Sequence, residues 1–366
     1  MRNFTVGPVH SPRCVLDTCA QDVPYFRTPE FSATMLESER LLLEFLGAPQ
    51  GSRAVFLTGS GTAGMEAAVM NLLGPGDRAI VVDGGSFGHR FVQLCEMHSV
   101  PHETIRLAPG QALRGEHLEP FAGRGFSAFL VNMHETSTGV LYDMPLIASF
   151  CRRERERGGM FLLVDAISAF LADPLDMAAL GAGAVVIGSQ KALACPPGVS
   201  AVALAPEALG RVSSGSPSSM YLDLRAALKD GERGQTPFTP AVGTLLAMNA
   251  RLREIAAGGG AAGEVAKVAA LASDFRARIA DLPLEKFSQS PSNAVTALRT
   301  PNKSARALFG TLKDEFGIWV CPNGGELSDE VFRVGHLGAL SAADNGMLAD
   351  ALHALNARGF FRRERK

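Results

Sequence analysis

Two residues at the ends of apolar runs indicate the chemistry of this chain. Lys191 lies in the segment Gly188-Ser189-Gln190-Lys191, which directly follows the apolar run Ala184 to Ile187. A lysine beside a buried strand is desolvated, and its unprotonated amine can form a Schiff base with an aldehyde. Asp165 ends the run Phe161 to Val164, where a carboxylate suits a pyridinium nitrogen. Together Lys191 and Asp165 predict a catalytic site for pyridoxal phosphate, whose protonated ring acts as an electron sink.

A glycine-rich turn is the candidate for holding the phosphate. Thr58-Gly59-Ser60-Gly61-Thr62-Ala63-Gly64 leads into residues 65–73, whose apolar positions follow helical spacing. The free N–H groups and the dipole at a helix N-terminus favour an anion. The turn lacks the lysine of a Walker motif and the spacing of a dinucleotide turn. An ordinary helix cap remains the alternative interpretation of this turn.

Three further segments have side chains suited to such a site. Phe87 follows an apolar run and could stack on a cofactor ring, or be a core residue. Ser137, within His134 to Gly139, could bond the ring oxygen or the phosphate, although a His-Glu pair is usually a surface or capping feature. Arg333 lies inside an apolar run, where its guanidinium needs either a substrate carboxylate or a structural salt bridge.

Alternating apolar runs and helical patterns predict the fold class, α/β. Five runs indicate strands of a mostly parallel, doubly covered sheet: 79–82, 128–131, 161–164, 184–187 and 201–204. Ligands collect at the carboxyl ends of such strands, which is where Asp165 and Lys191 fall. Short strands at 293–298, 317–321 and 331–334 indicate a small C-terminal α+β domain. We therefore expect an N-terminal arm (1–15), a large domain (16–245) and a small domain (246–366).

Composition excludes several classes of protein. The chain has 366 residues, 46% hydrophobic residues and a formal net charge of -2, so no electrostatic feature favours nucleic acid or an anionic membrane. The six cysteines are scattered, with no CxxC pair and no histidines at metal-ligand spacing, which argues against a metal site and a disulfide framework. The N-terminus has no apolar signal region, and no stretch of eighteen uncharged apolar residues follows. We expect a cytoplasmic protein.

The motifs, taken in order, resemble those of the class V (fold type I) pyridoxal-phosphate aminotransferases. The resemblance is to the branch of alanine-glyoxylate, serine-glyoxylate and 2-aminoethylphosphonate-pyruvate aminotransferases, and it runs through most of the chain. The matching segments are Val6-Gly7-Pro8, Phe26 to Phe31, Gly59 to Thr62 with Glu66, Glu135 to Gly139, Val164 to Ser168, Gly188 to Leu193 with Pro196-Pro197-Gly198, and Phe332 to Gly338.

The resemblance implies a role for each matching residue. Lys191 and Asp165 take the roles given above, and Phe87 takes the ring-stacking place. Arg333 matches the arginine that binds the substrate carboxylate. The implied cofactor contacts are Ser60, Gly61, Thr62 and Gln190 at the phosphate, Ser137 near the ring oxygen, and Thr236 or Thr239 at the phosphate of the neighbouring subunit. The last contact implies a homodimer with shared active sites.

The implied reaction is ping-pong transamination, from a small amino donor to pyruvate or glyoxylate. The segments Glu135 to Gly139 and Tyr221 to Leu224 resemble the 2-aminoethylphosphonate branch and favour that donor. The Gly-Ser-Gln-Lys segment is closer to the alanine- and serine-glyoxylate enzymes, which favours a small amino acid such as alanine or serine. A lyase or desulfurase on the same fold is the main alternative. A protein that binds the cofactor without turnover and a nucleotide-binding α/β domain are two others.

Overall fold

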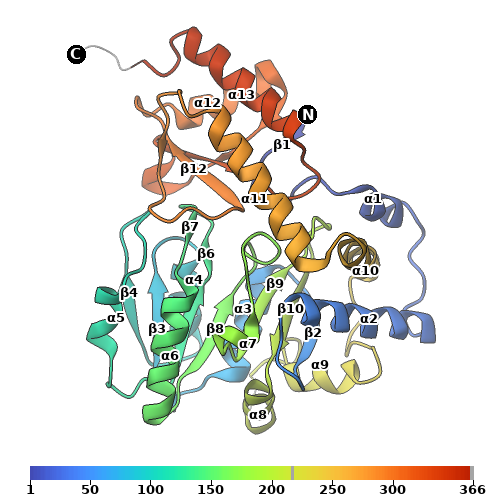
Figure 1. Ribbon diagram of the computed structural model, residues 1–366. Coiled ribbons are helices and arrows are strands. Elements are labelled where there is room, and N and C mark those ends of the chain that lie inside the picture. The colour runs from blue at the N-terminus through green and yellow to red at the C-terminus, as the bar shows by residue number, and fades with distance from the viewer. Residues whose placement is uncertain (216–217, 363–366) are drawn as a thin grey trace.

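A seven-stranded sheet forms the centre of the computed structural model, which describes residues 1–215 and 218–362 (Figure 1). The strand order is β2-β10-β9-β8-β5-β3-β4. Strand β10 runs in the opposite direction to the other six strands, so the predicted mostly parallel sheet is confirmed. The strands are β2 (Arg53–Thr58), β3 (Ala79–Asp83), β4 (His102–Arg106), β5 (Ala128–Asn132), β8 (Phe161–Asp165), β9 (Ala184–Gly188) and β10 (Val199–Leu204).

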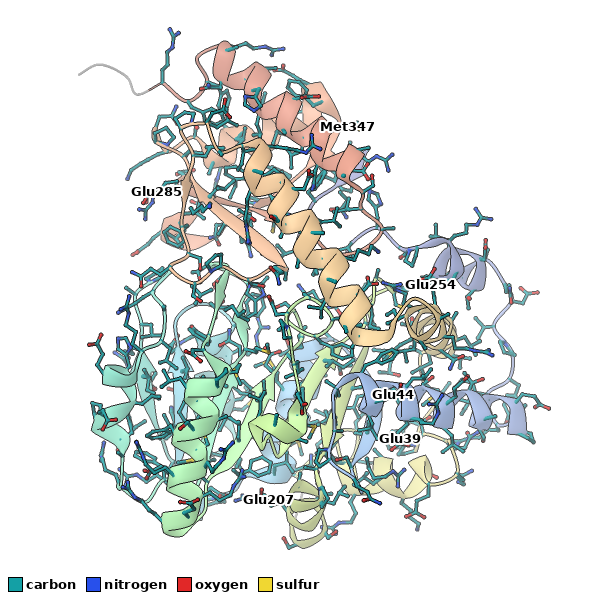
Figure 2. The ribbon with its side chains drawn as sticks, viewed as in Figure 1. Glu39, Glu44, Glu207, Glu254, Glu285 and Met347 are labelled. Atoms are coloured by element: carbon teal, nitrogen blue, oxygen red, sulfur yellow. The ribbon has the colours of Figure 1, made fainter. Side chains whose placement is uncertain are left out.

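Both faces of this sheet are covered, which explains why its central strands β5, β8 and β9 contain continuous apolar runs. Successive strand residues point to opposite faces, so Phe161 and Leu163 join one core, while Leu162 and Val164 join the other. Side chains fill the space between sheet and helices, and exposed carboxylates such as Glu44 and Glu207 belong to the outer helices (Figure 2). One face carries α3 (Gly61–Leu72), α4 (Gly88–Met97), α8 (Pro206–Ser214) and α9 (Leu224–Gly231); the other carries α2 (Pro29–Phe45), α6 (Met144–Gly158) and α10 (Val242–Ala257).

A second sheet, of order β11-β12-β15-β14, forms a separate α+β unit above the first in Figure 1. Phe275 and Phe332 lie fully buried in its own core. The predicted division at residue 245 falls inside α10, which packs against α2 and α11, and it stays a prediction. The elements are β11 (Glu285–Lys286), β12 (Val295–Arg299), β14 (Cys321–Pro322), β15 (Val331–Gly335), α11 (Gly260–Arg278), α12 (Ala305–Phe316) and α13 (Ala342–Ala357).

The N-terminal residues cross between the two units. Strand β1 (Arg2–Asn3) pairs in parallel with β13 (Ile318–Trp319), beside the second sheet. The chain then reaches α1 (Arg13–Cys19), which packs against α10. The remaining short elements are β6 (His134–Glu135), β7 (Val140–Leu141), α5 (Gly115–Leu118), α7 (Met177–Leu180) and the 3-10 turns Glu119–Phe121 and Gly325–Leu327.

The described residues contain no single helix that is long and apolar enough to cross a membrane. Within residues 1–215 and 218–362, one helix pair, α10 with α11, meets the length and composition expected of a span, and the two helices are bent by 87° relative to each other.

Candidate active site

Lys191 lies in the turn after β9 with its side chain almost fully buried. Its Nζ donates a hydrogen bond of 2.7 Å to the main-chain carbonyl of Val6. The pKa of Lys191 is lowered to about 8, mainly by burial; the charges of Arg333 and Arg90 add to the lowering, while Cys321 and Asp165 oppose it. The amine is therefore poised to lose its proton near neutral pH, as nucleophilic catalysis by lysine requires.

Asp165 ends β8 and is buried. Burial raises the pKa of this carboxyl to about 7, while the hydrogen bond that Ile167 N donates to Oδ1 at 2.8 Å acts in the opposite direction. A buried carboxylate is stabilised when a cation lies beside it, because the cation offsets the lost hydration. Asp165 is thus suited to a protonated ring nitrogen.

The predicted phosphate turn leads from β2 into the N-terminus of α3. Ser60 is the N-cap residue, but its side chain makes no capping hydrogen bond, which leaves the hydroxyl available to a ligand. Gly61 packs against Ile167, and a Cβ at this position would overlap Cδ1 of that side chain. The turn after Asp165 is thereby packed onto the start of α3, so the carboxylate and the anion-binding helix end share one site.

Thr62, Phe87 and Arg90 form one connected group beside this turn. Arg90 Nη1 donates to Thr62 Oγ1 at 3.0 Å, and the guanidinium carbon lies 5.0 Å from the centroid of the Phe87 ring. Arg90 forms no ion pair in the part of the chain that the structure describes. Its positive charge is close enough to help keep Asp165 ionised. From the sequence, Arg90 is one of several candidate anion contacts and is not among the predicted site residues.

Gln190 and Ser137 differ in the contacts that they make. The Oε1 atom of Gln190 is buried and has no hydrogen-bond partner among the described residues. The Ser137 hydroxyl, by contrast, donates to Glu135 and accepts from Ser86 N at 3.2 Å. The Oε1 atom of Gln190 is an acceptor, so a phosphate oxygen would be bound by the Nε2 donor of the same side chain, whereas the Ser137 hydroxyl already bonds to protein groups.

Glu135 is a structural residue of the site whose role the sequence analysis did not identify. Its carboxylate accepts from Gly88 N at 2.9 Å, Phe87 N at 3.2 Å and Asn132 Nδ2 at 2.9 Å. The first two N–H groups belong to the start of α4, where the N-cap residue is Phe87, which has no side-chain acceptor. The signal available in the sequence was a helix start at Phe87, a residue whose side chain cannot accept a capping hydrogen bond.

Arg333 is buried on β15 and makes no ion pair with any described residue. Its terminal nitrogens donate to two carbonyls, Thr136 O at 3.1 Å and Pro322 O at 2.8 Å, while Nε has no partner in the described structure. A buried guanidinium held only by neutral groups favours an anionic ligand. The structural salt bridge considered as an alternative is not present among the described residues.

A series of side-chain hydrogen bonds holds Thr136 in place. His134 Nδ1 lies 2.9 Å from Ser168 Oγ, which in turn lies 2.7 Å from Thr136 Oγ1. Burial lowers the pKa of His134 to about 3, so its ring is neutral. These contacts link Ser168, in the turn after Asp165, to Thr136, whose main-chain carbonyl accepts the hydrogen bond from Arg333.

The two candidate threonines differ in exposure. Thr236 is buried and its hydroxyl donates to Phe238 O at 2.8 Å, whereas Thr239 is exposed. Arg27 holds the same loop, because its Nη1 donates to Thr236 O at 3.0 Å and to Gln235 Oε1 at 3.2 Å. Of the two hydroxyls, that of Thr239 is the one presented outward.

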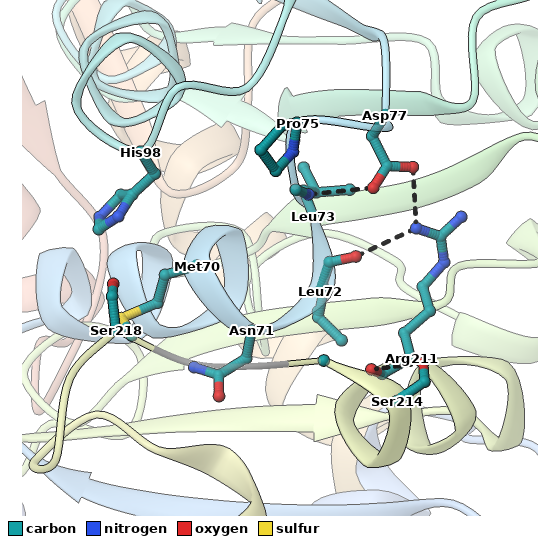
Figure 3. A pocket seen from close by; sticks show the side chains of 12 residues that line it. Met70, Asn71, Leu72, Leu73, Pro75, Asp77, His98, Arg211, Ser214 and Ser218 are labelled. Atoms are coloured by element: carbon teal, nitrogen blue, oxygen red, sulfur yellow. Dashed lines mark hydrogen bonds and ion pairs between the residues drawn. The ribbon is translucent and has the colours of Figure 1, made fainter.

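A polar cavity of about 430 Å³ lies at the other end of α3 and is separate from this site (Figure 3). Helix α3 has 12 residues, so its two ends are about 18 Å apart. Arg211 occupies part of this cavity, with Nη1 donating to Leu72 O and to Asp77, each at 3.1 Å. The cavity shares no residue with the candidate site.

The candidate site as a whole fits a phosphorylated aromatic aldehyde. It combines a buried amine of lowered pKa, a buried carboxylate, a helix N-terminus with a free hydroxyl, and a guanidinium without an acidic partner among the described residues. These groups match an aldehyde carbon, a ring nitrogen, a phosphate and a substrate carboxylate. Fold and site together define a pyridoxal-phosphate enzyme of fold type I.

Comparison with known proteins agrees with this definition. The family model "Aminotransferase class-V" matches residues 25–330. The chain is 32% identical to the soluble hydrogenase 42 kDa subunit of Anabaena cylindrica, over 92% of this chain and 88% of that protein. It is 26% identical to L-aspartate–glyoxylate aminotransferase of Paracoccus denitrificans, over 93% and 87%. The crystal structure of a subgroup IV aspartate aminotransferase from Thermus thermophilus superposes with a TM-score of 0.88 at 30% identity, covering 97% and 99%.

The chain belongs to the class V aminotransferases, whose cofactor is pyridoxal phosphate. The predicted family, fold class and cofactor are therefore confirmed. Hydrogenase activity is not an activity of this family, so that relative's name does not carry over to this chain.

Proposed function

We propose that this enzyme moves an amino group from a small amino donor to pyruvate or glyoxylate by a ping-pong mechanism. The donor is 2-aminoethylphosphonate or a small amino acid such as alanine or serine. The observation that carries the proposal is the pairing of a buried amine, Lys191, with a buried guanidinium that has no acidic partner among the described residues, Arg333. The charge of Arg333 is close enough to lower the pKa of the lysine, so both groups serve one bound substrate.

Each proposed residue has a separate task. Lys191 attaches the cofactor and moves a proton, and Asp165 holds the ring nitrogen protonated. Ser60, Gly61, Thr62 and Gln190 bind the phosphate, and Phe87 packs on the ring. Arg333 orients the substrate carboxylate. When bound, the cofactor supplies an electron sink that makes the proton on the substrate's α-carbon acidic.

The proposal includes a homodimer in the cytoplasm, in which one subunit completes the phosphate site of the other. Support comes from the exposed Thr239, whose loop is held in place by Arg27. We assign Thr239 to the partner's phosphate and Thr236 to the internal structure of the loop. Ser137 keeps a supporting role near the ring oxygen through its hydrogen bond to Glu135.

The test is a half-reaction followed by absorbance. The purified holoenzyme is mixed separately with 2-aminoethylphosphonate, alanine, serine and aspartate, and the visible band of the bound cofactor is recorded. Loss of that band with one amine, and its return on adding pyruvate or glyoxylate, is the expected result. A protein with no visible band, or one that responds to none of these amines, contradicts the proposal.

A lyase or desulfurase reaction is distinguished in the same experiment. Such an enzyme releases ammonia, phosphate or sulfide while the visible band persists. Cys321 lies on the strand next to Arg333 and close enough to influence the pKa of Lys191. It is part of β14, however, and not of a long loop that could carry a thiol to the substrate.

A further inference from the structure

The N-terminal arm touches the reacting lysine directly. The Val6 carbonyl accepts the hydrogen bond from Lys191 Nζ at 2.7 Å, the only hydrogen bond of this nitrogen in the described structure. The next residue, Gly7, packs on the same side chain: a Cβ there would lie 2.8 Å from Cδ and 3.1 Å from Nζ of Lys191. Gly7 also has φ of +124°, which side chains with a Cβ rarely adopt. Only glycine lets the arm pass this close to the lysine.

The arm is fixed from its other side by the strand that carries Arg333. Gly335 N donates to Phe4 O at 2.7 Å, and a Cβ on Gly335 would overlap Thr5 O. Gly335 is two residues after Arg333 on β15. The position of the Val6 carbonyl relative to Lys191 is therefore set by the strand that holds the proposed carboxylate-binding residue.

A carbonyl in this place affects which form of the lysine is stable. A buried ammonium has lost its hydration and needs an acceptor for its N–H groups. The charged groups around Lys191 act in both directions, since Arg333 and Arg90 oppose the ammonium while Asp165 and Cys321 favour it. The Val6 carbonyl adds a fixed, uncharged acceptor that stabilises the ammonium form.

We propose that Val6 and Gly7 position the amine of Lys191 whenever it is not covalently bound, so that the lysine can hold and return a proton. In the amino-transfer cycle the neutral amine takes the proton from the substrate's α-carbon and becomes an ammonium: the C–H bond breaks, an N–H bond forms, and the electron pair of the C–H bond would pass to the electron sink that the bound cofactor supplies. Val6 O accepts one of the ammonium's N–H groups until the proton is passed on. Val6 and Gly7 are thus positioning residues that act through Lys191. This use of the proton rests on the proposed function, but the hold on the amine does not.

The test measures Lys191 itself, in the enzyme freed of cofactor. Competitive acetylation with acetic anhydride across a pH series, read by mass spectrometry of the Lys191 peptide, gives the pKa of the amine. For Gly7→Ala we expect a pKa lower than the wild-type value by about 1 or more, since the displaced carbonyl no longer supports a buried ammonium. Acetylation at pH 7 should be correspondingly faster. A Gly7→Ala protein that titrates like the wild type overturns the proposal.

Two further variants separate this effect from general damage. Gly159→Ala introduces comparable backbone strain, at φ of +93° with no atom within 4 Å of the new Cβ, and should leave the Lys191 pKa unchanged. Gly335→Ala pushes the arm from its far side and should lower the pKa in the same direction, which decides the matter if Gly7→Ala does not fold. Thermal unfolding identifies the folded variants. If Gly7→Ala lowers the Lys191 pKa but the wild-type enzyme transfers no amino group, only the proposed function is refuted. If the wild-type enzyme transfers amino groups but the variant leaves the Lys191 pKa unaltered, only the role of the arm is refuted.

Discussion

Replacing Arg333 by lysine tests the carboxylate site most directly. A guanidinium has five N–H donors, of which Thr136 O and Pro322 O use two, leaving three that include the unpartnered Nε. A substrate carboxylate can take two of these as a bidentate pair. An ammonium has three donors, so after the same two carbonyls a lysine has one left. Arg333→Lys therefore loses one charge-assisted hydrogen bond to the substrate.

The size of the effect follows from that single bond. A hydrogen bond to a charged group contributes about 1.5–3 kcal/mol, and about 1.4 kcal/mol corresponds to a tenfold change. We expect kcat/KM for the amino acceptor to fall roughly 10- to 100-fold. Steady-state kinetics with pyruvate and with glyoxylate measures this fall, and the visible band reports that the cofactor is still bound.

A matched substitution on the neighbouring strand serves as the control. Arg299 lies on β12, with its side chain 40% exposed and paired with Glu330, so Arg299→Lys should change kcat/KM by less than about twofold. An Arg333→Lys enzyme with wild-type kcat/KM would refute the carboxylate role. So would an equal loss in both variants.

The remaining predictions concern the other proposed residues. Lys191→Ala should abolish the visible band and turnover while thermal unfolding stays cooperative; wild-type turnover would disprove the mechanism. The folded pKa of Asp165, about 7, lies above the ordinary value of 3.8, so its contribution to the stability of the cofactor-free protein is lost as pH rises through 7. Denaturant unfolding of the cofactor-free proteins should show that the free energy of unfolding falls less between pH 5 and pH 8 in Asp165→Asn than in the wild type. An identical fall in both proteins would count against this pKa. Thr239→Val should weaken cofactor retention on dialysis more than Thr236→Val does, and the reverse order would exchange their assignments.

Much of the fold could be predicted from the sequence because its signals are local. Continuous apolar runs at 128–131 and 161–164 mark strands covered on both faces, and they appear as β5 and β8. The strands β2 and β4 were not predicted. In β4, His102 and Glu103 are only partly buried, so this edge strand lacks the continuous apolar run of the central strands.

The candidate residues of the site were also identified from local sequence, but their partners were not. Asp165 ends one apolar run and Lys191 lies in the turn just after another, and that position alone places them at the carboxyl edge of a sheet. The contacts of Glu135 with α4 and of Arg90 with Thr62 join residues that are 28 or more positions apart. No local pattern encodes such pairs, because they depend on how strand ends and helix starts meet in space.

The sequence by itself determined which chemical groups are available: an amine, a carboxylate, an anion-binding helix start and an arginine within an apolar strand. Only the tertiary structure decided the state of those groups. The pKa of Lys191 is low and that of Asp165 is high because both are buried, and burial is a property of the packed chain. Likewise Val6, 185 residues before Lys191, becomes its hydrogen-bond acceptor only because the arm is held against β15.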